Sequence, residues 1–313
     1  MSGPGPARPV SGAQVDLRRG ELRARVGQVA AVLRGFWHGP AALTENWPDH
    51  VVAPMGAGIV LAPWPNRVAG GRWSLNGAAR QLDLTEPKRG NAIHGLLRNT
   101  VYQIADRDEA SVTQAASVYP QHGYPFTLDT TVTHALSDDG LTVTHTVSNV
   151  GTGTAPFGVG AHPYLRVGDT PVEQLTLTLA ARTRAEVDEK SIPTGLSPVS
   201  GQLAGLSDGI VVGTLGVFDG AFTDLAVADD RVHHRVTAPD GRGVTLWADQ
   251  VFGWAQVYTP DDFPGPGLPD RRTALAVEPM TCAADALNNG WGLQHLEPGD
   301  TWTGSWGLTP VGF

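Results

Sequence analysis

A few polar or charged side chains interrupt stretches that are otherwise apolar and bracketed by glycine or proline. Glu278 is the plainest case, because it ends the apolar run 275–277, where an ionised carboxylate is costly unless it is paired or functional. His162 precedes Pro163 in a similar setting. A carboxylate and an imidazole, with ordinary pKa values of about 4.3 and about 6.5, can serve together as base and acid near neutral pH. Comparable stretches contain five further polar residues: Asn66, Arg67, His94, Asp219 and Gln256. Each of these, taken singly, also fits a role in a turn or at the surface.

Several motifs of cofactor and nucleophile chemistry are missing from the sequence. The Gly-x-Gly sequences at 56–58 and 158–160 lack the third glycine of a dinucleotide-binding loop, and no Walker sequence occurs. No serine lies in a Gly-x-Ser-x-Gly elbow. The single cysteine, Cys282, excludes an intrachain disulfide and a cysteine zinc cluster. His233 and His234 would point to opposite faces of a strand, so we expect neither a cofactor nor a metal.

The elements that position these residues are predicted to be strands. Alternating apolar and polar residues recur between turns rich in the 39 glycines and 24 prolines, without the strand–helix alternation of a parallel sheet. We therefore expect an all-β protein, a large antiparallel β-sandwich. Residues 1–12 are predicted to form a flexible tail and residues 13–313 a single domain. A further strand is expected at 28–33, and one helical turn at 283–287.

Two-residue and short turn signals predict three hairpins. In one of them, a loop formed by Asp139 and Gly140 would place His134 opposite His145 on the apolar face of the sheet. Such a pair could bind a metal or a substrate, but more commonly it is a structural contact bonded to its neighbours. The three hairpins are 72–84 about Asn76-Gly77, 128–150 about Asp139-Gly140, and 231–248 about Pro239-Asp240-Gly241.

The charge balance makes some classes of partner improbable. The chain has 22 Lys and Arg against 31 Asp and Glu, a net charge of −9, with no basic cluster for nucleic acid and no basic amphipathic helix for a membrane surface. No apolar run is long enough to span a bilayer. The N-terminus lacks the apolar region of a signal peptide, so we expect a cytoplasmic protein, either a monomer or a homodimer.

Four short segments become specific when they are taken together and in order. They are Pro-Trp-Pro-Asn-Arg at 63–67, Gly-Asn-Ala-Ile-His-Gly at 90–95, Ala-His-Pro-Tyr at 161–164 and Val-Glu-Pro-Met-Thr-Cys at 277–282. From about Gly56 to Pro310 the chain resembles bacterial members of the aldose 1-epimerase (galactose mutarotase) family. The resemblance implies a galactose mutarotase-type β-sandwich with an open sugar cleft. It also implies a cofactor-independent isomerase that interconverts the α and β anomers of an aldose.

The resemblance also implies roles for individual residues. Glu278 matches the general base and His162 the general acid, whose protonated form a nearby carboxylate would favour. His94 matches a second histidine that holds the sugar and supports proton movement. The sugar hydroxyls would be bound by Asn66, Arg67, Tyr164, Asp219 and Gln256, with Trp64 or Trp254 either stacking on the ring or packing in the core.

Two departures from the common family pattern leave the substrate open. Leu96-Leu97-Arg98 follows His94-Gly95 in place of a run of glycines, and Gly220 follows Asp219 in place of a bulkier polar residue. A hexose phosphate is an alternative substrate, with Arg89 and Arg98 as candidate phosphate ligands. A non-catalytic sugar-binding module on the same fold is another possibility. A glycoside hydrolase using two carboxylates is weaker, since it leaves the histidines unexplained.

Overall fold

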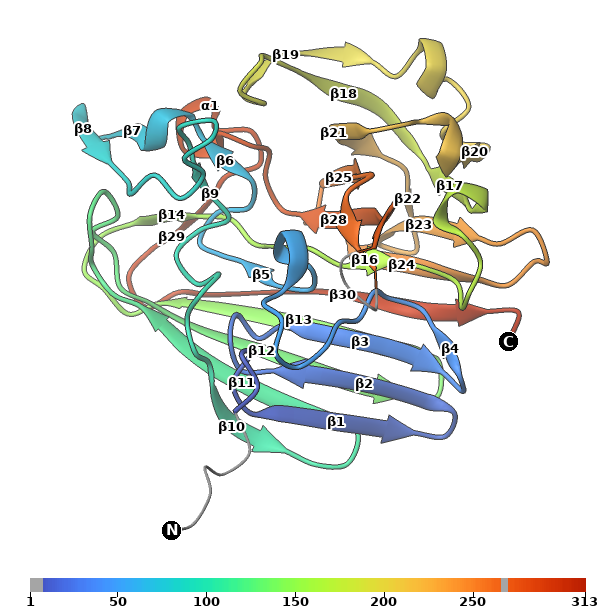
Figure 1. Ribbon diagram of the computed structural model, residues 1–313. Coiled ribbons are helices and arrows are strands. Elements are labelled where there is room, and N and C mark those ends of the chain that lie inside the picture. Colours follow the sequence, from blue (N-terminus) through green and yellow to red (C-terminus); the bar gives the residue numbers. More distant parts are fainter. Residues whose placement is uncertain (1–7, 266–269) are drawn as a thin grey trace.

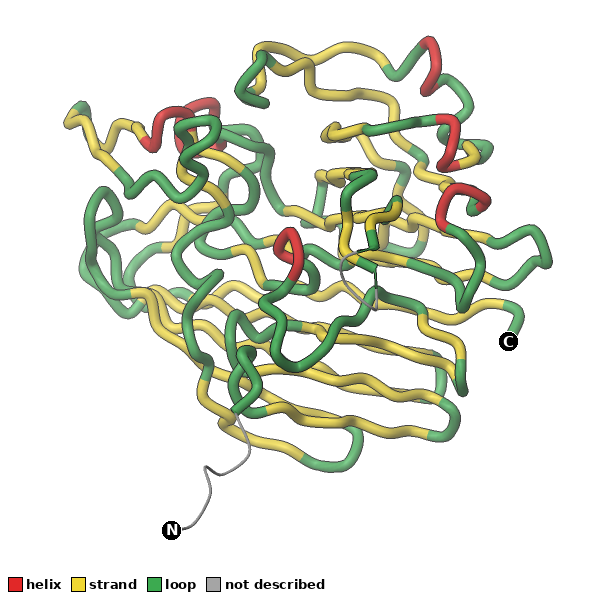
Figure 2. Tube along the Cα trace, viewed as in Figure 1, coloured by secondary structure: helices red, strands yellow, loops and turns green. Residues whose placement is uncertain are grey.

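The computed structural model describes residues 8–265 and 270–313. Strands account for most of this part of the chain, and the helices are single short turns at the ends of strands and in loops (Figure 2). Every pairing between the named strands is antiparallel within the described residues. The expectation of a large antiparallel all-β fold is therefore confirmed.

A ten-stranded sheet forms one layer of the molecule (Figure 1). In its central strands one face carries buried apolar residues such as Val143 and Val147, and the other carries half-buried threonines. This period of two is what a sheet covered on one face requires. In order, the strands are β10 (Gln103–Arg107), β11 (Ser111–Val118), β12 (Leu128–Ser137), β13 (Gly140–Asn149), β30 (Thr301–Val311), β24 (Gly243–Asp249), β23 (Arg231–Thr237), β17 (Thr176–Leu179) and β20 (Ile210–Val211), with β22 (Val227–Ala228) beside β23.

A four-stranded sheet covers part of the buried face of the first, where β1 and β2 pack on β12 (Figure 1). Leu17, Ala24 and Phe36 are fully buried and belong to the same apolar core as Val132 and Val143. The apolar faces of the two sheets are thus removed from water together. The strands are β1 (Gln14–Arg19), β2 (Leu22–Gly27), β3 (Leu33–His38) and β4 (Ala41–Ala42).

An eight-stranded sheet carries most of the chemically interesting residues. Its central strand, β28, is buried along its whole length, including Glu278. The strands are, in order, β19 (Pro193–Pro198), β18 (Ala181–Val187), β21 (Phe218–Leu225), β25 (Trp254–Thr259), β28 (Leu275–Met280), β15 (Gly160–Ala161) and β5 (Val60–Leu61), with β16 (Tyr164–Leu165) beside β28.

The remaining elements are small. In Figure 1 the pairs β6–β9 and β7–β8 lie on the opposite side of β28 from β18 and β21. The pairs are β6 (Arg67–Val68) with β9 (Ala92–Ile93), β7 (Arg72–Leu75) with β8 (Ala78–Gln81), β14 (Ala155–Phe157) with β29 (Gln294–Leu296), and β26 (Phe263–Pro264) with β27 (Arg271–Arg272). The helices are α1 (Ala286–Asn289) and the 3₁₀ turns η1 (Pro54–Gly56), η2 (Ala69–Gly71), η3 (Val172–Gln174), η4 (Gly201–Leu203) and η5 (Val212–Thr214).

Two of the predicted hairpins form as expected. Leu75 pairs with Ala78, so Asn76 and Gly77 make the two-residue turn, with φ of 52° and 79°. Left-handed values at both positions are those of a type I′ turn. β23 and β24 likewise pair from Arg231 to Thr237 across a loop at 238–242.

The predicted register of the third hairpin is wrong by two residues. Ser137 pairs with Gly140, so the loop is 138–139, and His134 faces Val143 while His145 faces Val132. Gly140 belongs to the strand because a β-carbon there would lie 2.2 Å from the Leu308 carbonyl oxygen of β30. Glycine is thus needed at position 140 for the close approach of β13 to β30, and not for the turn.

The two histidines of that hairpin remain on the buried face, although they do not form a directly opposed pair. Nε2 of His145 accepts a hydrogen bond from the Trp306 indole at 3.0 Å, a contact within the core. This is the structural role that such a residue commonly has.

Three further expectations have mixed outcomes. Residues 28–32 form a turn rather than a strand. Ala30 and Ala31 have positive φ and almost no exposure, so their apolar character reflects burial alone. The helical turn expected at 283–287 is present as α1, slightly later in the chain.

Within the segment expected to be a tail, the Val10 amide donates to the Asp49 carbonyl at 3.0 Å and Ser11 is buried, while residues 1–7 lie outside the described residues.

Candidate active site

Strand register brings the distant carboxylates and Gln256 together. Gln256 of β25 lies directly opposite Glu278 of β28, and Asp219 of β21 lies opposite Tyr258, two residues further along β25. Residues two apart in a strand point to the same face. The side chains of these four residues therefore share one face of the eight-stranded sheet, and the Gln256 amide donates to Asp219 Oδ1.

His162 reaches the same place from the end of β15. β15 pairs with β28 through Gly160 and Met280. Beyond this pair, the His162 amide donates to the Ile59 carbonyl, and the His162 carbonyl accepts from the Gly58 amide. His162 Nε2 lies 3.5 Å from Glu278 Oε1, and both side chains are almost completely buried. An imidazole and a carboxylate are thus placed side by side.

The ring of Tyr164, two residues beyond His162, packs against the imidazole. Its ring stacks on His162 with 5.1 Å between centroids and 12° between planes, and Phe263 packs on Tyr164 at 4.7 Å. Tyr164 does not line the cavity described below, and its hydroxyl is buried without a hydrogen-bond partner among the described residues. It was predicted to bind substrate; in the structure its ring packs on His162, and the cavity wall does not include it.

His94 is held next to His162 by an unusual backbone. It has φ of 62°, its amide donates to the Asn66 carbonyl at 2.8 Å, and its ring meets that of His162 edge-on at 5.4 Å. Gly95 follows with φ of 71°, where a β-carbon would lie 2.1 Å from the Ala62 carbonyl oxygen. Only glycine fits there, so the Gly-Asn-Ala-Ile-His-Gly segment encodes a fixed direction for the histidine.

Asn66 and Arg67 connect the two sides of the site. β6 pairs Arg67 with Ile93, which explains why Arg67 lies near His94. The Asn66 amide donates to Gln256 Oε1 at 3.2 Å, and Arg67 Nη1 lies 3.6 Å from Asp219 Oδ2. The segment at 63–67 is thereby tied to the strands that carry Glu278.

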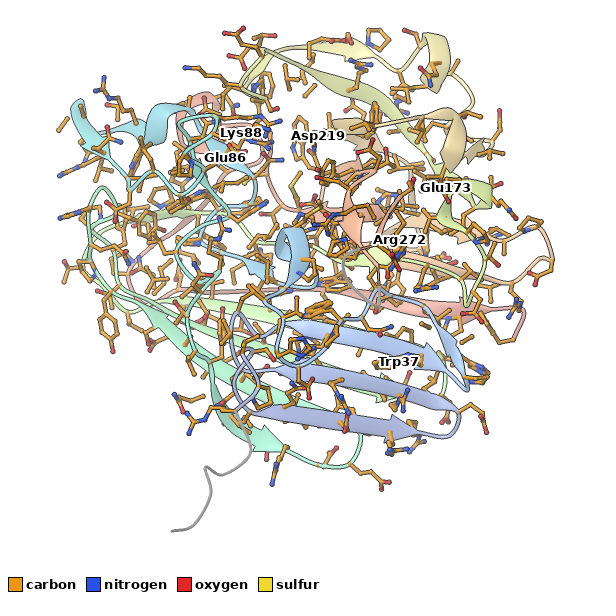
Figure 3. All side chains as sticks on the ribbon, viewed as in Figure 1. Trp37, Glu86, Lys88, Glu173, Asp219 and Arg272 are labelled. Atoms are coloured by element: carbon orange, nitrogen blue, oxygen red, sulfur yellow. The ribbon has the colours of Figure 1, made fainter. Side chains whose placement is uncertain are left out.

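These side chains surround a cavity of about 300 Å³, at the lower end of the range for small-molecule sites. Seven of the eight predicted site residues line it, with Tyr164 the exception. Figure 3 shows Glu86 and Asp219 on opposite sides of this region. The seven are Asn66, Arg67, His94, His162, Asp219, Gln256 and Glu278.

Besides the predicted catalytic and sugar-binding residues, the cavity wall contains others, of which the sequence had singled out only Arg89, as a candidate phosphate ligand. Glu86, Arg89 and Tyr258 supply polar groups, and Met55 and Val217 supply apolar surface. Tyr258 could have been found from the period-two rule, because it is two residues beyond Gln256 in the same strand. Glu86 had no comparable signal, since a carboxylate before a proline ordinarily belongs to an exposed turn.

Burial opposes charge at His162 and Glu278. It raises the pKa of Glu278 well above its ordinary value, an effect that Asp219 increases and Arg67 opposes. Burial also lowers the pKa of His162 to about 3, and lowers that of His94 well below its usual range. Burial thus favours the neutral imidazole at His162, whereas a nearby carboxylate was expected to favour the imidazolium.

Several buried polar atoms of the site have no partner among the described residues. These are Glu278 Oε2, His162 Nδ1 and His94 Nδ1. Leaving buried polar atoms unpaired costs free energy, and in native proteins such atoms ordinarily find protein or water partners. A polar ligand in the cavity would supply partners.

The two tryptophans proposed as a stacking wall are core residues. Trp64 packs against Tyr124 with 5.9 Å between ring centroids, and Trp254 stacks on Trp291 at 6.1 Å with nearly parallel planes. Neither lines the cavity. Tyr258 is the one aromatic side chain, apart from the two histidines, on the part of its wall that the structure describes.

The two arginines considered as a phosphate-binding pair lie apart. Arg89 is at the cavity wall, where Nη1 donates to Glu86 at 3.0 Å. Arg98 lines a separate cavity beside Val29 and Ile59, and donates to the Ile93 carbonyl. The two arginines therefore do not line the same cavity, as two ligands of one phosphate would.

Known proteins share both the sequence pattern and the fold. The chain matches the aldose 1-epimerase family over residues 43–309. It belongs to the aldose 1-epimerase family. The uncharacterized protein YihR of Escherichia coli is 34% identical over 293 residues, covering 92% of this chain and 90% of that protein.

Solved structures of this family agree on the fold. The GalM/aldose epimerase homologue of C. elegans superposes with a TM-score of 0.83 at 16% identity, covering 96% of this chain and 98% of that one. A galactose mutarotase-like protein of Clostridium acetobutylicum has a TM-score of 0.82 at 15% identity, covering 96% and 95%. The β-sandwich of this aldose 1-epimerase family member is thus the galactose mutarotase-like fold. In residues 8–265 and 270–313, no helix has the length and apolar character needed to cross a membrane.

Proposed function

We propose that the protein is an aldose 1-epimerase that interconverts the α and β anomers of an aldohexose by acid and base catalysis. The observation that carries the proposal is the buried pair of His162 and Glu278, 3.5 Å apart at a cavity of sugar-compatible size. Family membership supports the reaction class.

In this proposal, ring opening needs one proton removed and one supplied. Glu278 takes the proton from the C1 hydroxyl, the C1–O5 bond breaks as the C1–O1 carbonyl forms, and His162 gives a proton to O5. The aldehyde rotates about C1–C2 and the same steps run backwards on its other face. No net proton, electron or covalent bond is left on the protein.

The pKa shifts bear on how the pair's single proton is shared between His162 and Glu278 during the reaction. Before opening, the proton is on His162 and Glu278 is ionised; after opening, Glu278 holds it and His162 is neutral. Burial favours the second arrangement, because both groups are then uncharged. The pair is therefore suited to hold the open-chain aldehyde, while the positive charge of Arg67, which lowers the pKa of Glu278, favours the arrangement that starts the reaction.

The remaining cavity residues would bind the sugar. Arg67, Asp219 and Gln256 offer donors and acceptors for hydroxyls, and charged partners make the stronger hydrogen bonds. His94 Nδ1 is buried without a partner among the described residues, which suits a contact with the sugar near His162. Tyr258 supplies an aromatic surface.

Polarimetry of freshly dissolved α-glucose and α-galactose tests the proposal. We expect the protein to accelerate mutarotation of at least one aldose saturably, at rates proportional to protein concentration. Glucose 6-phosphate in parallel separates a neutral-sugar enzyme from a sugar-phosphate enzyme. Saturable binding by calorimetry with no acceleration of any of the three would instead indicate a sugar-binding module and contradict the proposal.

A further inference from the structure

Glu86 makes more contacts with cavity side chains than its place before a proline suggests. We propose that Glu86 is a positioning residue that fixes the Arg67 guanidinium in the orientation that binds sugar. This inference rests on the proposed function, since Arg67 is assigned there to sugar hydroxyls. Glu86 acts through Arg67 and not on the reacting atoms.

The pairing between Glu86 and Arg67 uses one edge of the guanidinium. Arg67 Nε lies 3.0 Å from Glu86 Oε2, and Nη2 lies 3.1 Å from Oε1, which is a bidentate arrangement. Two parallel bonds fix the plane of the guanidinium as well as its position. Nη1 is left for the cavity side, where it lies 3.3 Å from Asn66 Oδ1 and 3.6 Å from Asp219 Oδ2.

Glu86 is itself held rigidly. Its amide donates to the Asn91 carbonyl at 2.9 Å, and the Gly90 amide returns to the Glu86 carbonyl at 2.9 Å, closing a turn over 86–91. The side chains of Asn91 and Arg89 donate to the two carboxylate oxygens at 3.3 and 3.0 Å. A supporting group held in this way can define the direction of the group that it binds.

The Asn91 side chain links this turn to the other side of the site. Asn91 is fully buried, and its amide also donates to the Lys190 carbonyl at 3.1 Å, in the loop between β18 and β19. Its oxygen accepts from the Gly70 amide at 3.2 Å. The support of Glu86 is thus built from three separate segments, as a positioning role requires and a chance surface contact does not.

Charge is consistent with this role. Glu86 stays ionised, because hydrogen bonding and attraction to Arg67 lower its pKa more than partial burial raises it. The fixed guanidinium in turn lowers the pKa of Glu278. If Arg67 loses its fixed position, both sugar binding and the titration of the base should change.

A double-mutant cycle tests the inference. Glu86→Gln keeps the shape and removes the charge, and Arg67→Met removes the guanidinium. We expect Glu86→Gln to lower kcat/KM about tenfold, mainly through KM, and to move the acidic limb of the pH profile to higher pH. In the Arg67→Met background the same change should cost less than about twofold. Glu186→Gln, which removes an exposed carboxylate bonded to Arg184, is the matched control and should have no effect.

The outcomes separate the inference from the proposed function. If the wild-type protein does not accelerate anomer exchange, the proposed function fails, and a titration of the Arg67 Nε–H NMR signal with glucose and galactose then decides the positioning role. We expect Glu86→Gln to speed hydrogen exchange of that N–H and to weaken its response to sugar. Equal losses from Glu86→Gln with and without Arg67, or an unchanged kcat/KM and an unchanged Arg67 signal, would overturn the inference. Should Glu86→Gln fail to fold, Glu86→Asp, which keeps the charge and shortens the reach, is measured in the same cycle.

Discussion

Gln256 lies directly opposite Glu278 in the β25–β28 pair, and its side-chain amide joins Asn66 on one side to Asp219 on the other. The proposed base therefore shares one hydrogen-bonded sheet with two of the proposed hydroxyl-binding groups, Asp219 and Gln256. Catalytic groups on strands are held more precisely than groups on loops. This relationship suggests that sugar position and proton transfer are coupled through the sheet itself.

Asp219 is expected to affect both binding and the titration of Glu278. Asp219→Asn removes a charged acceptor, so KM should rise about tenfold. The Asp219 carboxylate also raises the pKa of Glu278. Without that charge the pKa of Glu278 falls, the base stays ionised to lower pH, and the acidic limb of kcat/KM moves to lower pH. A pH profile measured by polarimetry checks this; a shift towards higher pH would contradict it.

Tyr164 is expected to act through its ring and not its hydroxyl. The ring stacks on His162, whereas the hydroxyl has no partner among the described residues. Tyr164→Phe should therefore leave kcat within about twofold, while Tyr164→Ala, which frees the imidazole to rotate, should lower kcat tenfold or more. Circular dichroism and thermal unfolding control for folding, since a large-to-small change in the core also costs stability. Equal losses in the two variants would instead favour direct sugar binding by the hydroxyl.

Buried histidines outside the site are expected to make the fold sensitive to acid. Burial lowers the pKa of His134 to about 3, and those of His145 and His234 to about 4. In the unfolded chain these groups have their ordinary pKa, so it binds more protons than the folded state below about pH 6.5. The stability is fully present above that pH and is lost as pH falls towards 4, at about 1.4 kcal/mol per pH unit for each histidine.

Urea unfolding between pH 7 and pH 5 measures this dependence. His234→Leu should reduce the slope of unfolding free energy against pH by one histidine's share, because it removes a group whose pKa folding lowers. The change leaves no hydrogen-bond partner unpaired, since neither ring nitrogen of His234 has one among the described residues. His122→Ala, which removes an exposed imidazole, is the control for the loss of a histidine as such. A wild-type unfolding free energy that stays constant over this range would contradict the expectation.

The sequence predicted the local features of the site better than the long-range ones. His94 was recognisable within a six-residue segment that ends in Gly95, although the contact that requires glycine there, with Ala62, is a long-range one. Glu278 was recognisable because a carboxylate in a buried strand needs a reason. Neither inference depends on knowing which strands are neighbours.

Other features depend on contacts that a single sequence does not contain. Glu86 looks like a turn residue until Arg67 is placed beside it, and the pKa shift of His162 depends on complete burial. Trp64 and Trp254 were equally compatible with core and cavity, and only the packing of Tyr124 and Trp291 decides between them. Such outcomes are set by tertiary packing.

The register of the β12–β13 hairpin is a further example. Gly140 carries a turn signal, but its position in the strand is required by β30, which is more than 150 residues further along the chain. Gly140→Ala should therefore lower the unfolding free energy by about 3 kcal/mol, whereas Gly153→Ala, which meets open space, should be nearly neutral. Urea unfolding of the two variants compares them; equal effects would contradict this reason for the register.

The central claim is that Glu278 and His162 move both protons of the ring-opening step. Two-dimensional exchange NMR on an equilibrium mixture of anomers measures the interconversion rate directly, without depending on a net change in rotation. We predict that Glu278→Gln and His162→Ala each slow exchange at least a hundredfold, while thermal unfolding stays cooperative and His122→Ala exchanges like the wild type. Exchange at the wild-type rate in either Glu278→Gln or His162→Ala would contradict the account.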